Sequence, residues 1–155
     1  MTSIVCYLDL MSPQAGLAFE RLPEALLGIS YSVRYKPVLL ASLLKQQDLL
    51  RLAVACDEAG MPNRYVCETI FRYVLACGDE ASDTTRLVAL SGQLAPVQDE
   101  ASDRVNEQLK AHSAEAMAMG VFDGSTFVVD GQVFRGVESL PVLRNYLLGK
   151  ACVRP

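Results

Sequence analysis

Hydrophobic residues form a nearly continuous run close to the N-terminus, from about residue 3 to residue 10. A run without polar alternation predicts a central strand that is covered on both faces. Farther along, apolar and polar residues alternate in "ISYSVRY", which predicts a second strand over residues 29–35.

The segment between these strands has the pattern of a helix that begins at Ser12. Serine is a preferred helix cap, and Pro13 after it suits the first helical position. The predicted core face consists of Leu17, Ala18, Leu22 and Ala25. Pro23 removes one helical hydrogen bond and predicts a kink or break over residues 21–23. Strand, helix and strand in this order predict a right-handed parallel crossover.

The middle of the chain is helical over a long stretch, because apolar residues recur there at helical spacing. The predicted stripes are Leu43, Leu50 and Val54; Val66, Ile70, Val74 and Cys77; Leu87, Leu90, Ser91 and Leu94; and Val105, Leu109, His112, Ala116 and Met119, ending at Gly120. We expect an inserted, mainly helical block over residues 42–119.

The C-terminal part predicts a hairpin over residues 125–134, with Asp130-Gly131 as its turn. A final helix from Ser139 to about Leu148 covers it. The whole order predicts an α/β class and resembles a thioredoxin-like fold, β-α-β and then β-hairpin-α, with an inserted helical block. At 155 residues, of which 51% are hydrophobic, we expect a single domain over residues 1–155.

Composition narrows the classes of function. The net charge of −4 provides no basic footprint for nucleic acid, and no apolar run reaches the length of a membrane span. We therefore expect no nucleic-acid or membrane partner and a cytoplasmic location. The five cysteines are scattered and never form C-x-x-C, so we interpret them as reduced thiols rather than a zinc or dithiol site.

Two parts of the sequence resemble one family. "YLDLMSPQAGLAFERLP" (7–23) with "YKPVLL" (35–40), and "GVFDGSTFVVDGQVFRGVESL" (120–140), resemble the two ends of 2-hydroxychromene-2-carboxylate isomerases and kappa-class glutathione transferases, in the DsbA-like thioredoxin superfamily. The resemblance implies a glutathione site where the first helix begins, facing the loop before the hairpin. It implies that Ser12 is the catalytic serine, and that glutathione is bound by Gly124, Ser125, Thr126, Glu138 and Ser139.

The implied chemistry rests on the glutathione thiol. A helix N-terminus and a serine hydroxyl both favour a thiolate, which in the isomerase type adds reversibly to an unsaturated aromatic keto acid. A kappa-like transferase or peroxidase would use the same residues on another electrophile, and a homodimer is a further option. Dithiol activity is not expected, because the positions that would carry its cysteines read Ser12-Pro13-Gln14-Ala15.

The sequence also departs from the family. Ser125 stands where the family has a cis-proline, and we expect a trans peptide before it because a cis bond to a non-proline residue costs about 2.5–4 kcal/mol. Arg135 replaces an aromatic residue, while Glu138 keeps a carboxylate. "LLKQQDLLRL" joins strand and helix directly, which predicts a partly missing substrate wall, and Asp48 is the nearest counterpart of a family asparagine. The alternative function is therefore a non-catalytic binding or dimerisation protein.

The remaining polar candidates can also be explained by structural roles. Ser12 is a helix cap by spacing alone. Lys36 could reach a substrate carboxylate or be a solvated charge, and Ser113 could line the cleft or lie exposed on a helix. His112 is interpreted as a core or interface histidine satisfied by one hydrogen bond, and Asp9 as a structural anchor beside the first helix.

Overall fold

The computed structural model describes residues 1–39, 47–120 and 125–153. Its sheet has the strand order β2-β1-β3-β4. β1 (Thr2–Leu8) pairs in parallel with β2 (Tyr31–Pro37), whereas β3 (Ser125–Val129) is antiparallel to both β1 and β4 (Gln132–Arg135). The predicted α/β class and the parallel crossover are confirmed.

Both N-terminal strands have bounds that differ from the prediction. β1 ends at Leu8 because Asp9 turns the chain: its carboxylate accepts from Met11 N (3.0 Å) and its carbonyl oxygen from Ser12 N (3.1 Å). β2 starts at Tyr31, two residues after the predicted start at Ile29. Ile29 N instead donates to the carbonyl oxygen of Leu26 (3.0 Å), in the turn that follows the first helix.

The first helix, α1 (Pro13–Ala25), is capped as predicted, with Ser12 Oγ accepting from Ala15 N at 3.2 Å. Its predicted core face is partly wrong, since Leu17 is 40% exposed and Phe19 is buried instead. The Phe19 ring packs against aromatic residues of two other elements. Its ring centroid lies 5.4 Å from that of Tyr35 in β2 and 5.2 Å from that of Phe71 in α3 (Arg64–Cys77).

Of the predicted kink or break over residues 21–23, the break does not occur, and α1 continues to Ala25. Proline has no N–H, so the carbonyl oxygen of Phe19 loses its usual backbone donor. Arg64 of α3 donates to that oxygen instead, at 3.2 Å. A tertiary contact therefore supplies what the local sequence lacks.

The helical block consists of α2 (Gln47–Ala55), α3, a short 3-10 turn η2 (Gly78–Ser82), α4 (Thr84–Leu94) and α5 (Asp103–Ala118). The predicted stripe on α5 is confirmed, since Val105, Leu109, His112 and Ala116 are all buried. In α3 the buried residues are Val66, Cys67, Ile70 and Phe71, so the stripe is rotated away from Val74 and Cys77, which are half-buried. Leu43 lies outside the described residues.

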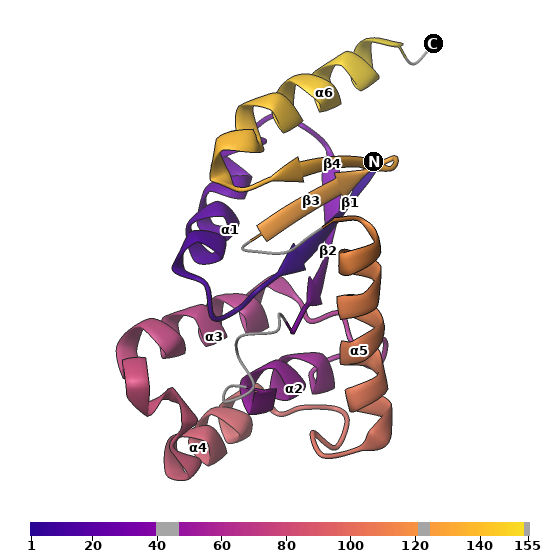
Figure 1. Cartoon of the computed structure of the whole chain (residues 1–155). Helices are drawn as coiled ribbons and strands as arrows, with labels where there is room; N and C mark the ends of the chain where they lie inside the picture. Colours follow the sequence, from indigo (N-terminus) through magenta and orange to yellow (C-terminus); the bar gives the residue numbers. More distant parts are fainter. Residues whose placement is uncertain (40–46, 121–124, 154–155) are drawn as a thin grey trace.

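The sheet is covered on both faces (Figure 1). α1 and α6 (Leu140–Val153) share the main core on one face, while α5 packs over Tyr7 and Val128 on the other. α2, α3 and α4 gather beyond the carboxyl ends of β1 and β2. Within the described ranges, no helix is both long enough and apolar enough to cross a membrane.

The hairpin is confirmed in detail. Asp130 and Gly131 have φ values of 50° and 78°, the left-handed pair that a two-residue type I′ turn requires. After β4, a short 3-10 helix, η3 (Val137–Ser139), leads into α6. Ser125 at the start of β3 and η3 at the end of β4 therefore lie at the same end of the hairpin.

Candidate functional site

Ser12 ends the turn that leads from β1 into α1. Its Oγ accepts from Ala15 N, and its carbonyl oxygen accepts from Gly16 N at 3.1 Å. In the first turn of α1, Pro13 has no amide hydrogen and the N–H of Ala15 is bonded to Ser12. This leaves the backbone N–H of Gln14, for which the described residues provide no acceptor. Capping uses a lone pair of the Ser12 hydroxyl and leaves its proton able to donate.

A hollow of about 500 Å³ lies beside the N-terminal half of α1. It is lined by Gln14, Leu17, Ser125, Arg135, Gly136, Val137 and Glu138, and we call it the α1–η3 hollow. Its volume falls within the range of roughly 300–1,000 Å³ that is typical of small-molecule sites. Ser12 lines an adjoining cavity of about 170 Å³ against Phe71 of α3, and Leu17 borders both spaces.

Ser125 is the first residue of β3, opposite Leu8 of β1. It is only 3% exposed, and its hydroxyl has no hydrogen-bond partner among the described residues. Its carbonyl oxygen accepts from Gly136 N at 3.0 Å. Thr126 is 1% exposed and pairs with strands on both sides. Gly124, and with it the predicted trans peptide before Ser125, lies outside the described residues.

Glu138 also lines the α1–η3 hollow, and none of the described residues forms an ion pair with its carboxylate. The carboxylate lies close to the Cα of Gly136, so that a Cβ at that position would collide with it. Ser139 Oγ donates to the carbonyl oxygen of Gly136 at 2.7 Å and closes η3. Arg135 directs its guanidinium toward Gly120 at the end of α5.

Lys36 and Ser113 lie elsewhere, between the sheet and α5. Lys36 Nζ is 2.7 Å from a carboxylate oxygen of Glu115, which also accepts from Tyr7 OH at 3.1 Å. Ser113 Oγ accepts from Leu39 N and donates to the carbonyl oxygen of Leu109, both at 2.9 Å. The structure therefore does not bring these two residues together with the α1–η3 hollow.

The charges and hydrogen bonds around Glu115 are those of a group with a structural role. Partial burial alone would raise its pKa, but the hydrogen bond and charge of Lys36 hold it below the usual carboxyl value. Burial and the neighbouring Glu115 raise the pKa of Tyr7 to about 12. Burial lowers the pKa of His112, whose Nδ1 lies 3.3 Å from the carbonyl oxygen of Pro37. The interpretation of His112 as a core histidine with one hydrogen bond is confirmed.

The cysteines do not form a reactive site among the described residues. Cys6, Cys56, Cys67 and Cys77 are all free thiols. Burial raises the pKa of both Cys6 and Cys67, which disfavours the thiolate that a nucleophile or a metal ligand needs. The described ranges also contain no group of three or more potential metal ligands.

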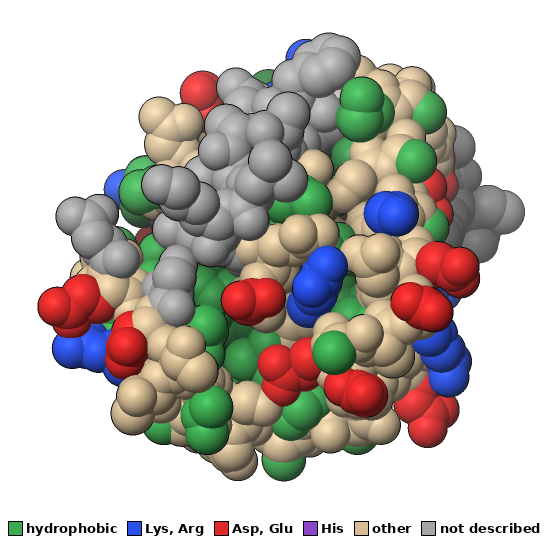
Figure 2. Space-filling view, turned by 60° about the horizontal axis from the view of Figure 1, so that its bottom comes forward, with side chains coloured by type: hydrophobic (Ala, Val, Ile, Leu, Met, Phe, Trp, Pro, Cys, Tyr) green, Lys and Arg blue, Asp and Glu red, His purple; other side chains and the backbone are tan. Residues whose placement is uncertain are grey.

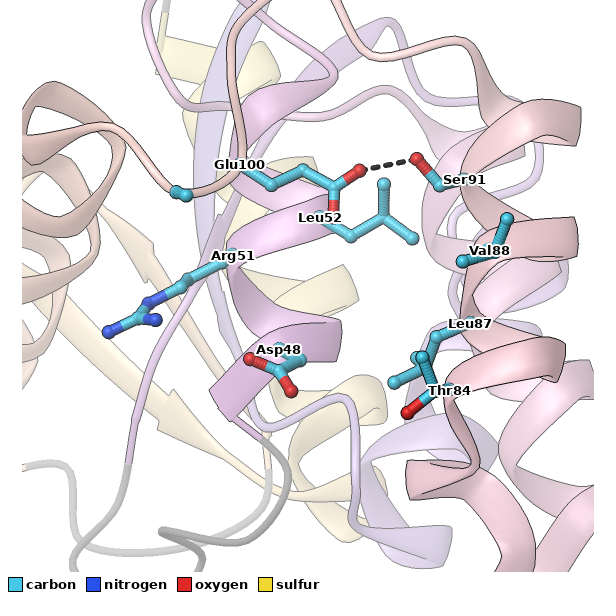
Figure 3. A pocket seen from close by; sticks show the side chains of 9 residues that line it. Asp48, Arg51, Leu52, Thr84, Leu87, Val88, Ser91 and Glu100 are labelled. Carbon is cyan, nitrogen blue, oxygen red and sulfur yellow. Dashed lines mark hydrogen bonds between the residues drawn. The ribbon is translucent and has the colours of Figure 1, made fainter.

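A second hollow, of about 330 Å³, lies in the helical block between α2 and α4. On the face shown in Figure 2, charged side chains surround a patch of hydrophobic ones. In Figure 3, Ser91 donates to Glu100 at the rim, whereas Arg51 extends away from α4. Asp48 lines this space, so the counterpart of the family asparagine is not part of the α1–η3 hollow.

Comparisons with known proteins agree on the architecture. No protein-family model matches the sequence, and no curated protein matches it either. Among solved structures, 2-hydroxychromene-2-carboxylate isomerase matches with a TM-score of 0.69 and 17% identity, covering 97% of this chain and 96% of that one. DsbA from Xylella fastidiosa matches with a TM-score of 0.72 and 15% identity, covering 98% and 87%. Reduced DsbA1 from Neisseria meningitidis matches with 0.66 and 13%, covering 97% and 83%.

The chain has a DsbA-like thioredoxin fold. Within this fold, α1 begins with proline, glutamine and alanine after Ser12 and carries no cysteine in its first turn. Sequence reasoning did not identify Gln14, Leu17 and Gly136 as lining residues of the hollow. Gln14 had a usable signal, because it directly follows the capping Ser-Pro pair and therefore lies in the first helical turn.

Proposed function

We propose that this protein is a glutathione-dependent isomerase of the 2-hydroxychromene-2-carboxylate isomerase type. The observation that supports it is the α1–η3 hollow, which adjoins the capped start of α1 and reaches the carboxylate of Glu138, for which the described residues provide no ion-pair partner. The residues present fit the tripeptide, because the hollow has ligand size and is lined by Ser125, whose buried hydroxyl has no hydrogen-bond partner within the described ranges.

Glu138 is the proposed acceptor for the α-amino group of glutathione. Its carboxylate is not neutralised by any described cation, so an ammonium group would meet an available negative charge there. Gln14 adds a backbone N–H at the start of α1. These groups orient the tripeptide with its cysteine toward Ser12.

Ser12 is the proposed group that stabilises the sulfur anion. Its hydroxyl proton can donate to sulfur while its oxygen caps Ala15, so both roles are compatible. The positive end of the α1 dipole favours the same anion. When bound, glutathione would supply a thiolate that adds to the double bond of an unsaturated aromatic keto acid, allows rotation about that bond and leaves unchanged. A kappa-like transferase or peroxidase would use the same arrangement on another electrophile.

A second candidate is a non-catalytic binding protein with this fold. It is favoured by the cavity directly beside Ser12, whose volume of about 170 Å³ lies below the usual range for small-molecule sites, roughly 300–1,000 Å³. Lys36 and Ser113, moreover, have partners within the protein.

Thermal unfolding with and without millimolar glutathione tests binding. A ligand at a hundred times its Kd stabilises the folded state by about 2.7 kcal/mol, so a clear rise in Tm is expected. The thiol of the bound tripeptide is then titrated by its ultraviolet absorbance in the wild type, in Ser12→Ala and in Ser12→Thr. The pKa should rise in Ser12→Ala and be retained in Ser12→Thr. An unchanged Tm in the wild type would contradict glutathione binding, and an unchanged thiol pKa in Ser12→Ala would leave Ser12 as a cap.

A further inference from the structure

The hydroxyl of Ser125 is buried beside a ligand-sized hollow, and the described part of the chain provides it with no hydrogen-bond partner. The residue is 3% exposed, and neither a described donor nor a described acceptor meets its Oγ. A buried polar group without a hydrogen bond destabilises a fold, and such groups are rare in native proteins. The protein therefore gains nothing in stability from a hydroxyl at this position.

The direction of the Ser125 side chain follows from the pleat of β3. Side chains alternate between the two faces of a strand, and Phe127, two residues on, belongs to the core that α1 and α6 share. Ser125 therefore faces the α1 side of the sheet. It lines the α1–η3 hollow, whose other lining residues come from α1, from the end of β4 with Gly136, and from η3.

Backbone groups of Ser125 and Thr126 already form hydrogen bonds within the sheet and to Gly136. Its carbonyl oxygen accepts from Gly136 N, and Thr126 pairs with Tyr7 of β1 on one side and Arg135 of β4 on the other. The side-chain hydroxyl, which lies just beneath the surface of the hollow, is the one buried side-chain polar group of Ser125 and Thr126 for which the described residues show no partner. A ligand in the hollow would therefore engage this part of β3 through that hydroxyl.

We propose that Ser125 is a positioning residue whose hydroxyl donates a hydrogen bond to an oxygen of the ligand in the α1–η3 hollow. This inference rests on the proposed function and names a residue that recognises the glutathione ligand. Glu138, which lines the same hollow, accepts from a cationic group of the same ligand. The pair selects a ligand that presents an oxygen acceptor near an ammonium group, as the γ-glutamyl head of glutathione does.

The test uses Ser125→Ala and S-methylglutathione, which fills the hollow without an ionisable thiol and so separates recognition from thiol activation. Affinity measured by calorimetry should fall about tenfold in Ser125→Ala, the loss expected for one hydrogen bond to a charged group. The Tm of the variant without ligand should equal or exceed that of the wild type, because an unsatisfied hydroxyl has been removed. A purely structural role would lower the Tm and leave the affinity unchanged.

Ser32→Ala is the matched control, since Ser32 is an exposed serine of β2 that lines none of these spaces. It should change neither affinity nor Tm. Equal affinity of Ser125→Ala and the wild type for S-methylglutathione would overturn this inference and leave glutathione binding intact. If the wild type binds neither S-methylglutathione nor glutathione, the proposed function fails and the inference fails with it.

Discussion

Arg64 donates a hydrogen bond to the carbonyl oxygen of Phe19, which lies four residues before Pro23 in α1. The same guanidinium donates to Tyr35 OH at 3.2 Å and lies 4.1 Å from the centroid of the Phe19 ring. One side chain of α3 thus joins the helix that carries Ser12 to strand β2. Its contacts keep α1 continuous past an interior proline.

Arg64→Met should destabilise the fold by about 1–3 kcal/mol, because it leaves the Phe19 oxygen without its donor and removes the charge over the ring. Urea unfolding measures the change. Arg72→Met, on the same helix, is the control: its ion pair with Glu68 is exposed, so the loss should be at most about 0.5 kcal/mol.

The same bond can be checked by a double-mutant cycle. Pro23→Ala restores a backbone N–H that can donate to Phe19 O, so Arg64→Met should destabilise less in a Pro23→Ala background than in the wild type. Strictly additive changes in unfolding free energy would show that the Arg64 bond does not compensate for Pro23.

Ser12→Asp should separate capping from thiol activation. Aspartate caps a helix as well as serine does, so the unfolding free energy should be retained. It brings a negative charge and no donor, so the thiol pKa of bound glutathione should rise. Ser102→Ala is the control, because Ser102 caps α5 in the same way: it should lose about 1 kcal/mol of stability and leave the thiol pKa unchanged. A thiol pKa that stays low in Ser12→Asp would exclude the proposed role of Ser12.

Asp9→Asn should stabilise the protein at neutral pH. Burial raises the pKa of the Asp9 carboxyl in the folded state, although the Met11 hydrogen bond opposes the shift. A raised folded pKa means that the native state binds more protons, so stability is highest below the unfolded pKa and falls as pH rises through the folded one. Asparagine keeps an oxygen for Met11 N without the charge. The gain should therefore disappear as urea unfolding is repeated at falling pH, toward the usual aspartate pKa of about 4.

Asp99 provides the matched control for that experiment. Its carboxylate accepts from Ala101 N and its carbonyl oxygen from Ser102 N, both at 3.0 Å, which repeats the turn of Asp9 at an exposed position. Asp99→Asn should leave stability nearly unchanged, because the Asp99 side chain is exposed and asparagine keeps the oxygen that accepts from Ala101 N. A loss of stability in Asp9→Asn at neutral pH would show that its charge is stabilising.

Gly136→Ala should weaken glutathione binding. Gly136 has φ 74° and ψ 176°, a region that is essentially restricted to glycine and costs other residues about 1–3 kcal/mol. The new Cβ would also displace the Glu138 carboxylate. Gly131→Ala has a comparable φ of 78° and meets no atom within 4 Å, so it should lose stability but keep affinity. Calorimetry and urea unfolding separate the two effects, and equal affinities would exclude Glu138 from binding.

The sequence predicted those features of the fold that depend on neighbouring residues alone. The Ser12-Pro13 start of α1 and the Asp130-Gly131 turn each depend on the φ preferences and side-chain oxygens of adjacent residues, and both are confirmed. The missing break at Pro23 depends on Arg64, which lies 41 residues farther along the chain. No pattern within α1 contains that information.

The buried face of α1 and the composition of the hollow have the same limitation. Periodicity placed Leu17 and not Phe19 on the core face, whereas the burial of Phe19 follows from the rings of Tyr35 and Phe71 in other elements. Ser125 and Glu138 were named from a family resemblance. Their position around one space with Gln14 follows from the pairing of β3 with β1 and β4, which appears only in the folded chain.

The enclosed sulfurs of Cys6 and Cys67 have a practical consequence for work on this protein. While the chain stays folded, oxidised tripeptide cannot readily form a mixed disulfide with either of them, because both are 0% exposed and protonated. Their alkylation under native conditions would instead record transient opening of the interior. These two cysteines can thus serve as built-in reporters of conformational exchange.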